Sequence, residues 1–130
     1  MSLVRKKTMN QLRGYKNLKT FQKAEELVLL IYKVTKDFPK TETYGLVDQI
    51  KRASISVMAN IAEGCGRQTI KDRIHFLYMA RGSLIEVECF IDLSLKLKYI
   101  NEKQHGQLVE LRNEVGKLLN GLIKSLKKGV

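Results

Sequence analysis

Five polar side chains between residues 49 and 63 are the first candidates for chemistry in this sequence. They are spaced three or four residues apart, so a single helix would align them in one row: Gln49, Arg52, Ser56, Asn60 and Glu63. Such a row could bind a ligand or catalyse a reaction, form a buried hydrogen-bonding network, or face water. We favour the buried network, because an apolar stripe with helical spacing runs beside the row.

A carboxylate further along the chain supports this interpretation. Glu86 shares a predicted helical face with apolar residues such as Met79, and a carboxylate in an apolar stripe needs a partner. We expect Arg52 to be central, with Asn60 and Ser83 as neutral partners, either within one chain or across a subunit interface. The predicted structural network has seven members: Gln49, Arg52, Ser56, Asn60, Glu63, Ser83 and Glu86.

The histidines and serines carry only weak catalytic signals. His75 and His105 fall on different predicted helices, without acidic ligands at metal-binding spacing, and we expect both on the surface. Ser54, Ser56 and Ser83 have no histidine at a spacing that makes a nucleophile and base pair, although folding could bring such groups together. We therefore expect a non-enzymatic protein without a metal, a cofactor or a small-molecule substrate.

The cysteines and the hydropathy indicate the cellular compartment. Cys65 and Cys89 lack CxxC spacing, so we expect reduced, packed thiols. The first 19 residues are polar and basic rather than secretory, and no apolar run approaches the roughly 18 residues of a membrane span. A cytoplasmic location without a membrane partner is the expectation.

The net charge of +11 is concentrated at the two ends of the chain. No acidic residue occurs in residues 1–20 or 117–130, whereas the intervening residues are almost neutral. The terminal basic residues are Arg5, Lys6, Lys7, Arg13, Lys16, Lys19, Lys117, Lys124, Lys127 and Lys128.

The apolar periodicity predicts four helices and no strand. The first ends at Phe38, because Pro39 disfavours a helical predecessor. The second runs roughly from residue 42 or 44 to 63 and closes at residues 64–66, where a glycine can adopt the left-handed conformation. The third starts at the cap Thr69 and runs to about residue 98, and the fourth follows a cap pair at Asn101 and Gln104.

Short connections between these helices predict an all-α fold, an antiparallel up-down-up-down four-helix bundle over residues 19–130, preceded by a flexible basic arm over residues 1–18. In this topology both basic ends meet the turn between the second and third helices. Arg67, Lys71 and Arg73 lie in that turn. We call this end, with the terminal basic residues given above, the basic pole.

The basic pole favours binding to nucleic-acid phosphates, with RNA preferred. Tyr15 is the one aromatic in the arm that is placed to stack on a base. The alternative is a structural oligomer or protein-interaction adaptor, whose charge only maintains solubility. A third interpretation, binding to an anionic membrane, is less favoured, because neither basic segment has a long apolar face with aromatic anchors.

The third predicted helix is apolar on two faces, which predicts a homo-oligomer. One face carries Ala80, Leu84 and Val87, and a second carries Met79 and Leu93. Such a helix is either central in a bundle or covered by another subunit.

Two stretches, YGLVDQIKRASISVMANIAEGCGR and FLYMARGSLIEVE, resemble the 23S rRNA intervening-sequence protein family, also called four-helix bundle proteins. The resemblance extends from about Asn17 to Leu126. It implies a short helical bundle, and some members assemble as rings of five, so it suggests a pentamer. The genes of this family were first noticed inside 23S rRNA insertions, and a distantly similar bundle assists a reverse transcriptase. The resemblance thus implies RNA without assigning a biochemical function.

Overall fold

The computed structural model describes residues 14–129, and every regular element in this part of the chain is helical. The elements in chain order, with η for a 3-10 helix, are η1 Gly14–Asn17, α2 Lys19–Thr35, η2 Lys40–Glu42, α3 Leu46–Gly66, α4 Ile70–Lys96 and α5 Glu102–Lys128. The predicted all-α fold with four long helices is confirmed. Of the predicted arm, residues 1–13 lie outside the described residues and residues 14–17 form η1.

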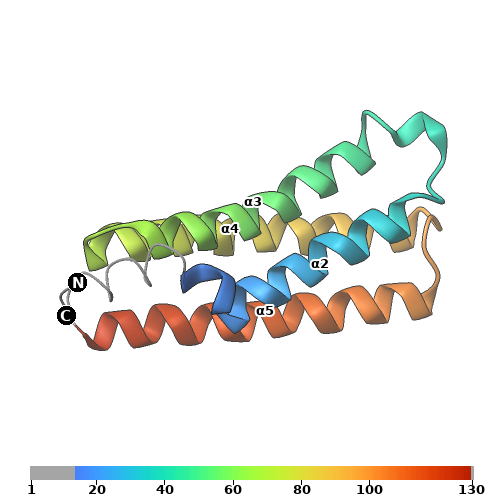
Figure 1. Ribbon diagram of the computed structural model, residues 1–130. Coiled ribbons are helices and arrows are strands. Elements are labelled where there is room, and N and C mark those ends of the chain that lie inside the picture. Colours follow the sequence, from blue (N-terminus) through green and yellow to red (C-terminus); the bar gives the residue numbers. More distant parts are fainter. Residues whose placement is uncertain (1–13, 130) are drawn as a thin grey trace.

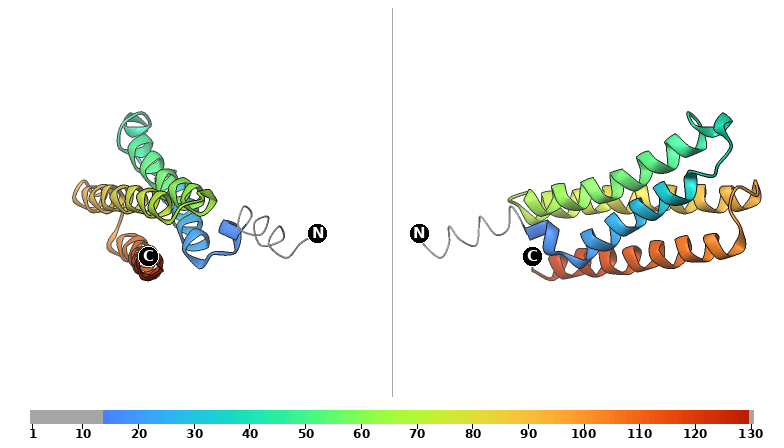
Figure 2. Two further views of the ribbon diagram at one scale, coloured as in Figure 1. Left: turned by 90° about the vertical axis from the view of Figure 1, so that its left-hand side faces the viewer. Right: turned by 45° about the vertical axis from the view of Figure 1, so that its right-hand side comes forward.

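The four long helices form an up-down-up-down bundle. In Figure 1, α2 and α4 run from left to right, and α3 and α5 return from right to left. α2 contacts α3 and α5, and α4 contacts the same two helices, so the four helices form a closed ring. The end-on view in Figure 2 shows the same arrangement, with α5 and α3 on different sides of the bundle.

Apolar side chains from all four helices fill the centre of this ring. The apolar residues that recur every three or four positions in the sequence point inward, as their periodicity predicts. The most deeply buried include Leu27, Ile31, Val57, Ile61, Leu84, Val87, Val115 and Leu119.

Two helix starts follow the predicted caps. The Thr69 hydroxyl accepts a hydrogen bond from the Asp72 amide at the start of α4, over a distance of 3.1 Å. At the start of α5, the Asn101 side chain accepts from the Gln104 amide, and the Gln104 side chain accepts from the Asn101 amide. Each cap satisfies amide groups that have no partner within the helix.

The connection between α2 and α3 differs from the prediction, because residues 40–42 form η2 and α3 starts only at Leu46. The Glu42 side chain stabilises this connection through two hydrogen bonds. One of its carboxylate oxygens accepts a hydrogen bond from the Leu46 amide, and the other accepts from the Tyr99 hydroxyl at 2.8 Å. The hydrogen bond to Glu42 raises the pKa of Tyr99 above its usual value. A Cβ atom at Gly45 would come within 2.7 Å of the Glu42 carboxylate, so a larger residue there would require this carboxylate to shift.

The predicted left-handed glycine at the end of α3 is wrong. None of the glycines among residues 14–129 has a positive φ, and α3 continues as a regular helix to Gly66. Gly64 instead permits close packing between α3 and α4. A Cβ atom there would lie 3.2 Å from the Arg73 carbonyl oxygen and 3.3 Å from the Phe76 Cβ.

This packing gives a testable contrast between two glycines. Gly64→Ala should lower the free energy of unfolding by about 1 kcal/mol or more, because the added methyl pushes the first turns of α4 away from α3. Gly121→Ala in α5 should raise it by about 0.5–1 kcal/mol, because nothing lies within 4 Å of the new Cβ and alanine favours the helix. Urea denaturation measures both. A Gly64→Ala variant as stable as the parent protein would contradict the close-packing role.

Candidate nucleic-acid interface

The predicted convergence of basic residues is present in the described part of the chain. The start of α2, the α3–α4 connection and the end of α5 lie at the same end of the bundle, on the left in Figure 1. Only two acidic residues, Glu63 and Asp72, occur in these segments. The basic residues placed there are Lys16, Lys19, Arg67, Lys71, Arg73, Lys117, Lys124, Lys127 and Lys128. Arg5, Lys6, Lys7 and Arg13 lie outside the described residues.

The two arginines at the α3–α4 connection stabilise the turn itself. Arg67 pairs with Glu63 one helical turn earlier, and its guanidinium lies 4.4 Å from the centre of the Phe76 ring. Arg73 donates a hydrogen bond of 2.7 Å to the Arg67 carbonyl oxygen. We conclude that these two residues contribute positive potential while their side chains are engaged in the fold.

Exposed lysines of α5 present the charge to solvent. Lys117, Lys124 and Lys128 are spaced seven and four residues apart, so they lie on one face of the helix, and all three are exposed. Lys117 and Lys19 also line a hollow of about 350 Å³ between α5 and α2. The ammonium groups of these lysines are therefore accessible from solvent.

Lys23 lines the same hollow but is held by carboxylates. Its ammonium lies 3.0 Å from Glu26 and 3.3 Å from Glu114. Hydrogen bonds to these two carboxylates, Glu26 first, raise the pKa of Lys23 above its usual value. The acidic side chains around Lys23 mark where the positive surface ends.

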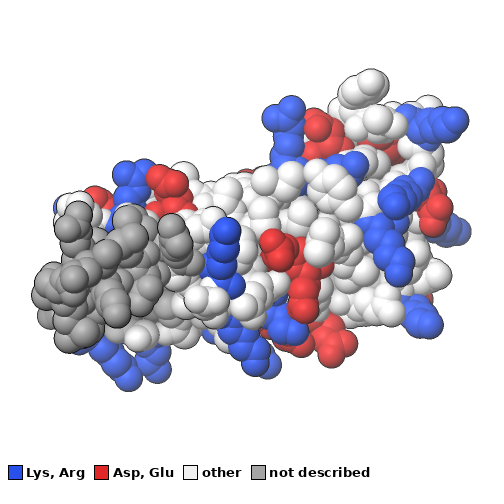
Figure 3. All heavy atoms as spheres, viewed as in Figure 1, with Lys and Arg blue, Asp and Glu red and all other residues white. Residues whose placement is uncertain are grey.

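The opposite end of the molecule is also basic, although less so. Figure 3 shows lysines and arginines in blue at the right-hand end. Around the α2–α3 and α4–α5 connections the basic residues outnumber the acidic residues Asp37, Glu42 and Glu102. The basic residues there are Lys33, Lys36, Lys40, Lys96, Lys98 and Lys103. Tyr44, which is 94% exposed, lies in the first of these connections.

Three members of the predicted polar network meet between α3 and α4. The hydroxyls of Ser56 and Ser83 are 2.8 Å apart, and the Asn60 amide nitrogen donates to the Ser56 carbonyl oxygen at 2.9 Å and to its hydroxyl at 3.1 Å. All three side chains are half-buried. This cluster joins the two helices around Ser56, whereas sequence analysis expected Asn60 and Ser83 to be partners of Arg52.

The charged members of the network lie on the outside of the single chain. Arg52 pairs with Asp48 on its own helix, at 2.9 Å, rather than with Asn60 or Ser83. Glu63 pairs with Arg67, as described above. Gln49 and Glu86 are exposed. Within one chain the row is therefore a small hydrogen-bonded cluster with exposed residues at both ends.

The outer face of α4 exposes apolar side chains, as predicted for its second face, and Glu86 is exposed among them. Four side chains of α4 and of the residue directly after it are between 43% and 55% exposed: Met79, Ile85, Leu93 and Leu97. Phe90 is half-buried beside them. Sequence analysis did not single out Ile85, which is the most exposed of the four.

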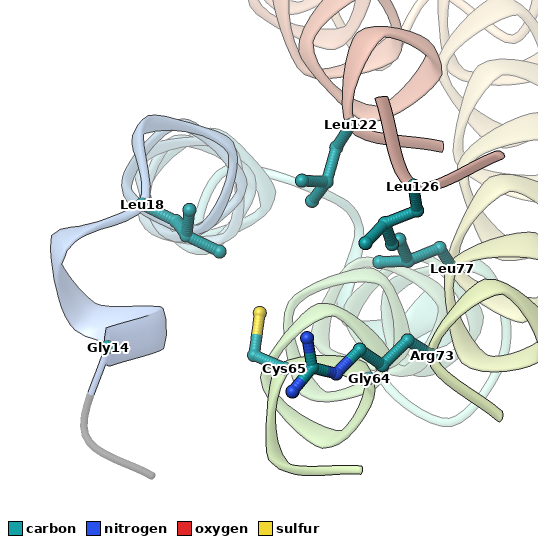
Figure 4. Close-up of a pocket in the computed structure, with 8 residues that line it drawn as sticks. All are labelled: Gly14, Leu18, Gly64, Cys65, Arg73, Leu77, Leu122 and Leu126. Carbon is teal, nitrogen blue, oxygen red and sulfur yellow. The ribbon is translucent and has the colours of Figure 1, made fainter. Parts of the chain in front are cut away.

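The two cysteines differ from each other. Cys65 is half-buried and lines a cavity of about 200 Å³ with Leu18, Leu122 and Arg73, as Figure 4 shows. Burial raises the pKa of the Cys65 thiol, and the positive charge of Arg73 opposes that rise. The prediction of a packed thiol is wrong for Cys89, which is exposed on α4.

The histidines and aromatic residues also depart from the predictions in part. His75 is exposed, but His105 is half-buried, with its Nε2 atom 3.0 Å from the Asp92 carboxylate. Tyr15 packs edge-on against Phe21, with ring centres 4.9 Å apart. Sequence analysis missed Tyr78, which lies beside Lys127 at the basic pole.

Neither a metal-binding cluster nor a membrane-spanning helix occurs in residues 14–129. In this range no three His, Cys, Asp or Glu side chains lie close enough together to hold a metal ion. None of the helices described is both long and apolar enough to span a bilayer.

Comparisons with known proteins agree with the resemblance seen in the motifs. The model of the 23S rRNA-intervening sequence protein family matches residues 16–121. The crystal structure of a protein of unknown function from the S23 ribosomal protein family of Bacteroides thetaiotaomicron is 27% identical, with a TM-score of 0.75 over 81% of this chain and 95% of that chain. No curated protein matches the sequence. Because the family model matches most of its length, the chain belongs to the 23S rRNA-intervening sequence protein family.

Proposed function

We propose that this protein is a non-enzymatic helical bundle that binds nucleic acid, preferably RNA, through phosphate contacts at the basic pole. The proposal rests on one observation: three basic segments meet at one end of the bundle. Glu63 and Asp72 are the only acidic residues in these segments. Like charges held together destabilise the fold, and a bound polyanion relieves that repulsion. The family description supports RNA as the partner.

The contacts proposed are to phosphates rather than to base edges. Lysines such as Lys124 and Lys128 bind a phosphate as point charges and do not read base identity. Affinity should therefore depend little on the nucleotide sequence. No small-molecule substrate, metal or cofactor enters this proposal. The free cysteines are compatible with a reducing cytoplasm, where we propose that the protein acts.

We also propose that the protein is a homo-oligomer, with the outer face of α4 covered by a second copy. Several large apolar side chains on that face are about half exposed in the single chain, and exposed apolar side chains gathered on one helix are typical of protein interfaces. The resemblance described above suggests five subunits. In the alternative function this assembly is the entire role of the protein, as a structural oligomer or adaptor.

Binding of an RNA oligonucleotide at low salt tests the proposal against this alternative. Fluorescence anisotropy would compare the full chain with a chain lacking residues 1–16 and with the triple variant Lys124→Gln, Lys127→Gln and Lys128→Gln. We expect both changes to weaken binding, because each removes positive charge from the basic pole. If the full chain fails to bind, or if both altered proteins bind as tightly as the full chain, the adaptor function is favoured instead.

A further inference from the structure

A groove at the basic pole has features that phosphate binding alone does not require. It lies between the first two turns of α4 and the last turn of α5, and has a volume of about 900 Å³. Its apolar walls are formed by Ile70, Ile74 and Tyr78, and Lys71, His75 and Lys127 add polar groups. The groove thus combines a flat aromatic ring with positive charge.

Tyr78 is held in place from two directions. It is partly buried against the hydrophobic core, which fixes the ring on the surface of α4. The Lys127 ammonium lies 5.1 Å from the ring centre, and the Arg81 guanidinium lies 4.7 Å from it. Arg81 is in turn 3.4 Å from the Asn120 side-chain oxygen. The ring is therefore a π-surface anchored on α4, and its neighbour Lys127 is a long exposed side chain.

We propose that this groove binds an unpaired nucleotide, with its base stacked on Tyr78 and its flanking phosphates contacted by Lys71 and Lys127. The inference rests on the proposed function, because it assumes that nucleic acid binds at the basic pole. Stacking on an aromatic side chain requires only a π-face on the ligand, so any of the bases can bind.

Charge and shape together favour this occupant over an apolar protein segment. Lys71 and Lys127 both line the groove, so their ammonium groups are available to the phosphates on either side of a stacked base. Lys127 must leave the ring when a base enters, and its ammonium is then free to contact a phosphate. Paired bases in a duplex are already stacked on one another, so the groove should select single strands, loops or frayed ends.

The test compares an oligothymidine of about eight nucleotides with an abasic oligonucleotide of the same length, which has the same phosphates but no bases. The full chain should bind the oligothymidine about fivefold or more tightly. Tyr78→Leu should remove this preference and leave binding to the abasic strand unchanged, whereas Tyr78→Phe should retain it. Tyr44→Leu is the matched control, because Tyr44 is 94% exposed at the opposite end of the molecule.

The outcomes separate this inference from the proposed function. Equal binding of the full chain to both oligonucleotides would overturn the stacking site and leave phosphate binding intact, without reliance on any variant. No binding to either oligonucleotide at low salt would overturn both. A base preference lost in Tyr44→Leu or Tyr15→Leu, but kept in Tyr78→Leu, would place stacking elsewhere. Thermal unfolding of each variant establishes that it is folded.

Discussion

A fourfold increase in salt concentration is expected to weaken RNA binding by about 100-fold. Each phosphate neutralised on a single strand contributes about 0.7 to the slope of log affinity against log salt concentration. If about five of the exposed lysines at the basic pole each contact a phosphate, the slope is about −3.5. An apolar interface between subunits has no such dependence, because its driving force is the burial of surface rather than the release of counterions.

The lysines at the end of α5 should contribute measurably to the slope of log affinity against log salt concentration. Changing Lys124, Lys127 and Lys128 to glutamine should make the slope shallower by about 2, because three phosphate contacts are lost. The matched control changes Lys33, Lys36 and Lys40 to glutamine, which removes the same charge from the opposite end of the bundle. Equal effects of the two triple variants would show that the net charge, and not the basic pole, determines binding.

The fold was predictable from sequence where the signals are local. The caps at Thr69 and Asn101 fix two helix starts through hydrogen bonds that span three residues, and the apolar periodicity identifies the inward faces. The prediction failed where a distant contact decides the local conformation. Gly64 allows α4 to pack closely against α3. The start of α3 depends on Glu42, which accepts hydrogen bonds from the Leu46 amide and from the distant Tyr99 hydroxyl.

The candidate site was predictable in its charge but not in its shape. The short connections between the helices predict an up-down-up-down topology, and this topology places the basic segments at one end of the bundle. The groove beside Tyr78 could not be predicted, because it forms between residues about 50 positions apart in sequence, at the start of α4 and the end of α5. The partner of Arg52 was also not predicted from the sequence. Its actual partner, Asp48, is a residue four positions away that sequence analysis did not consider for this role.

Two glutamates introduced on the outer face of α4 should convert the proposed oligomer to a monomer. We expect the parent protein to sediment as a species heavier than one chain, and the double variant Ile85→Glu and Leu93→Glu to sediment as a single chain. Each glutamate would be buried against apolar surface at the interface, and an unpaired buried carboxylate costs several kcal/mol. The thermal unfolding of a single chain should change little, because Ile85 and Leu93 are 55% and 43% exposed in it.

The matched control for this variant is Leu29→Glu, which introduces a glutamate at a residue that is 63% exposed on α2. It should leave the assembly intact. A parent protein that sediments as a single chain, or a double variant that stays assembled, would contradict the role of the α4 face. Assembly should also steepen the salt dependence of RNA binding, because an oligomer with several basic poles contacts more phosphates on one strand. The monomeric variant should therefore bind RNA with a shallower salt dependence, although none of its lysines has been changed.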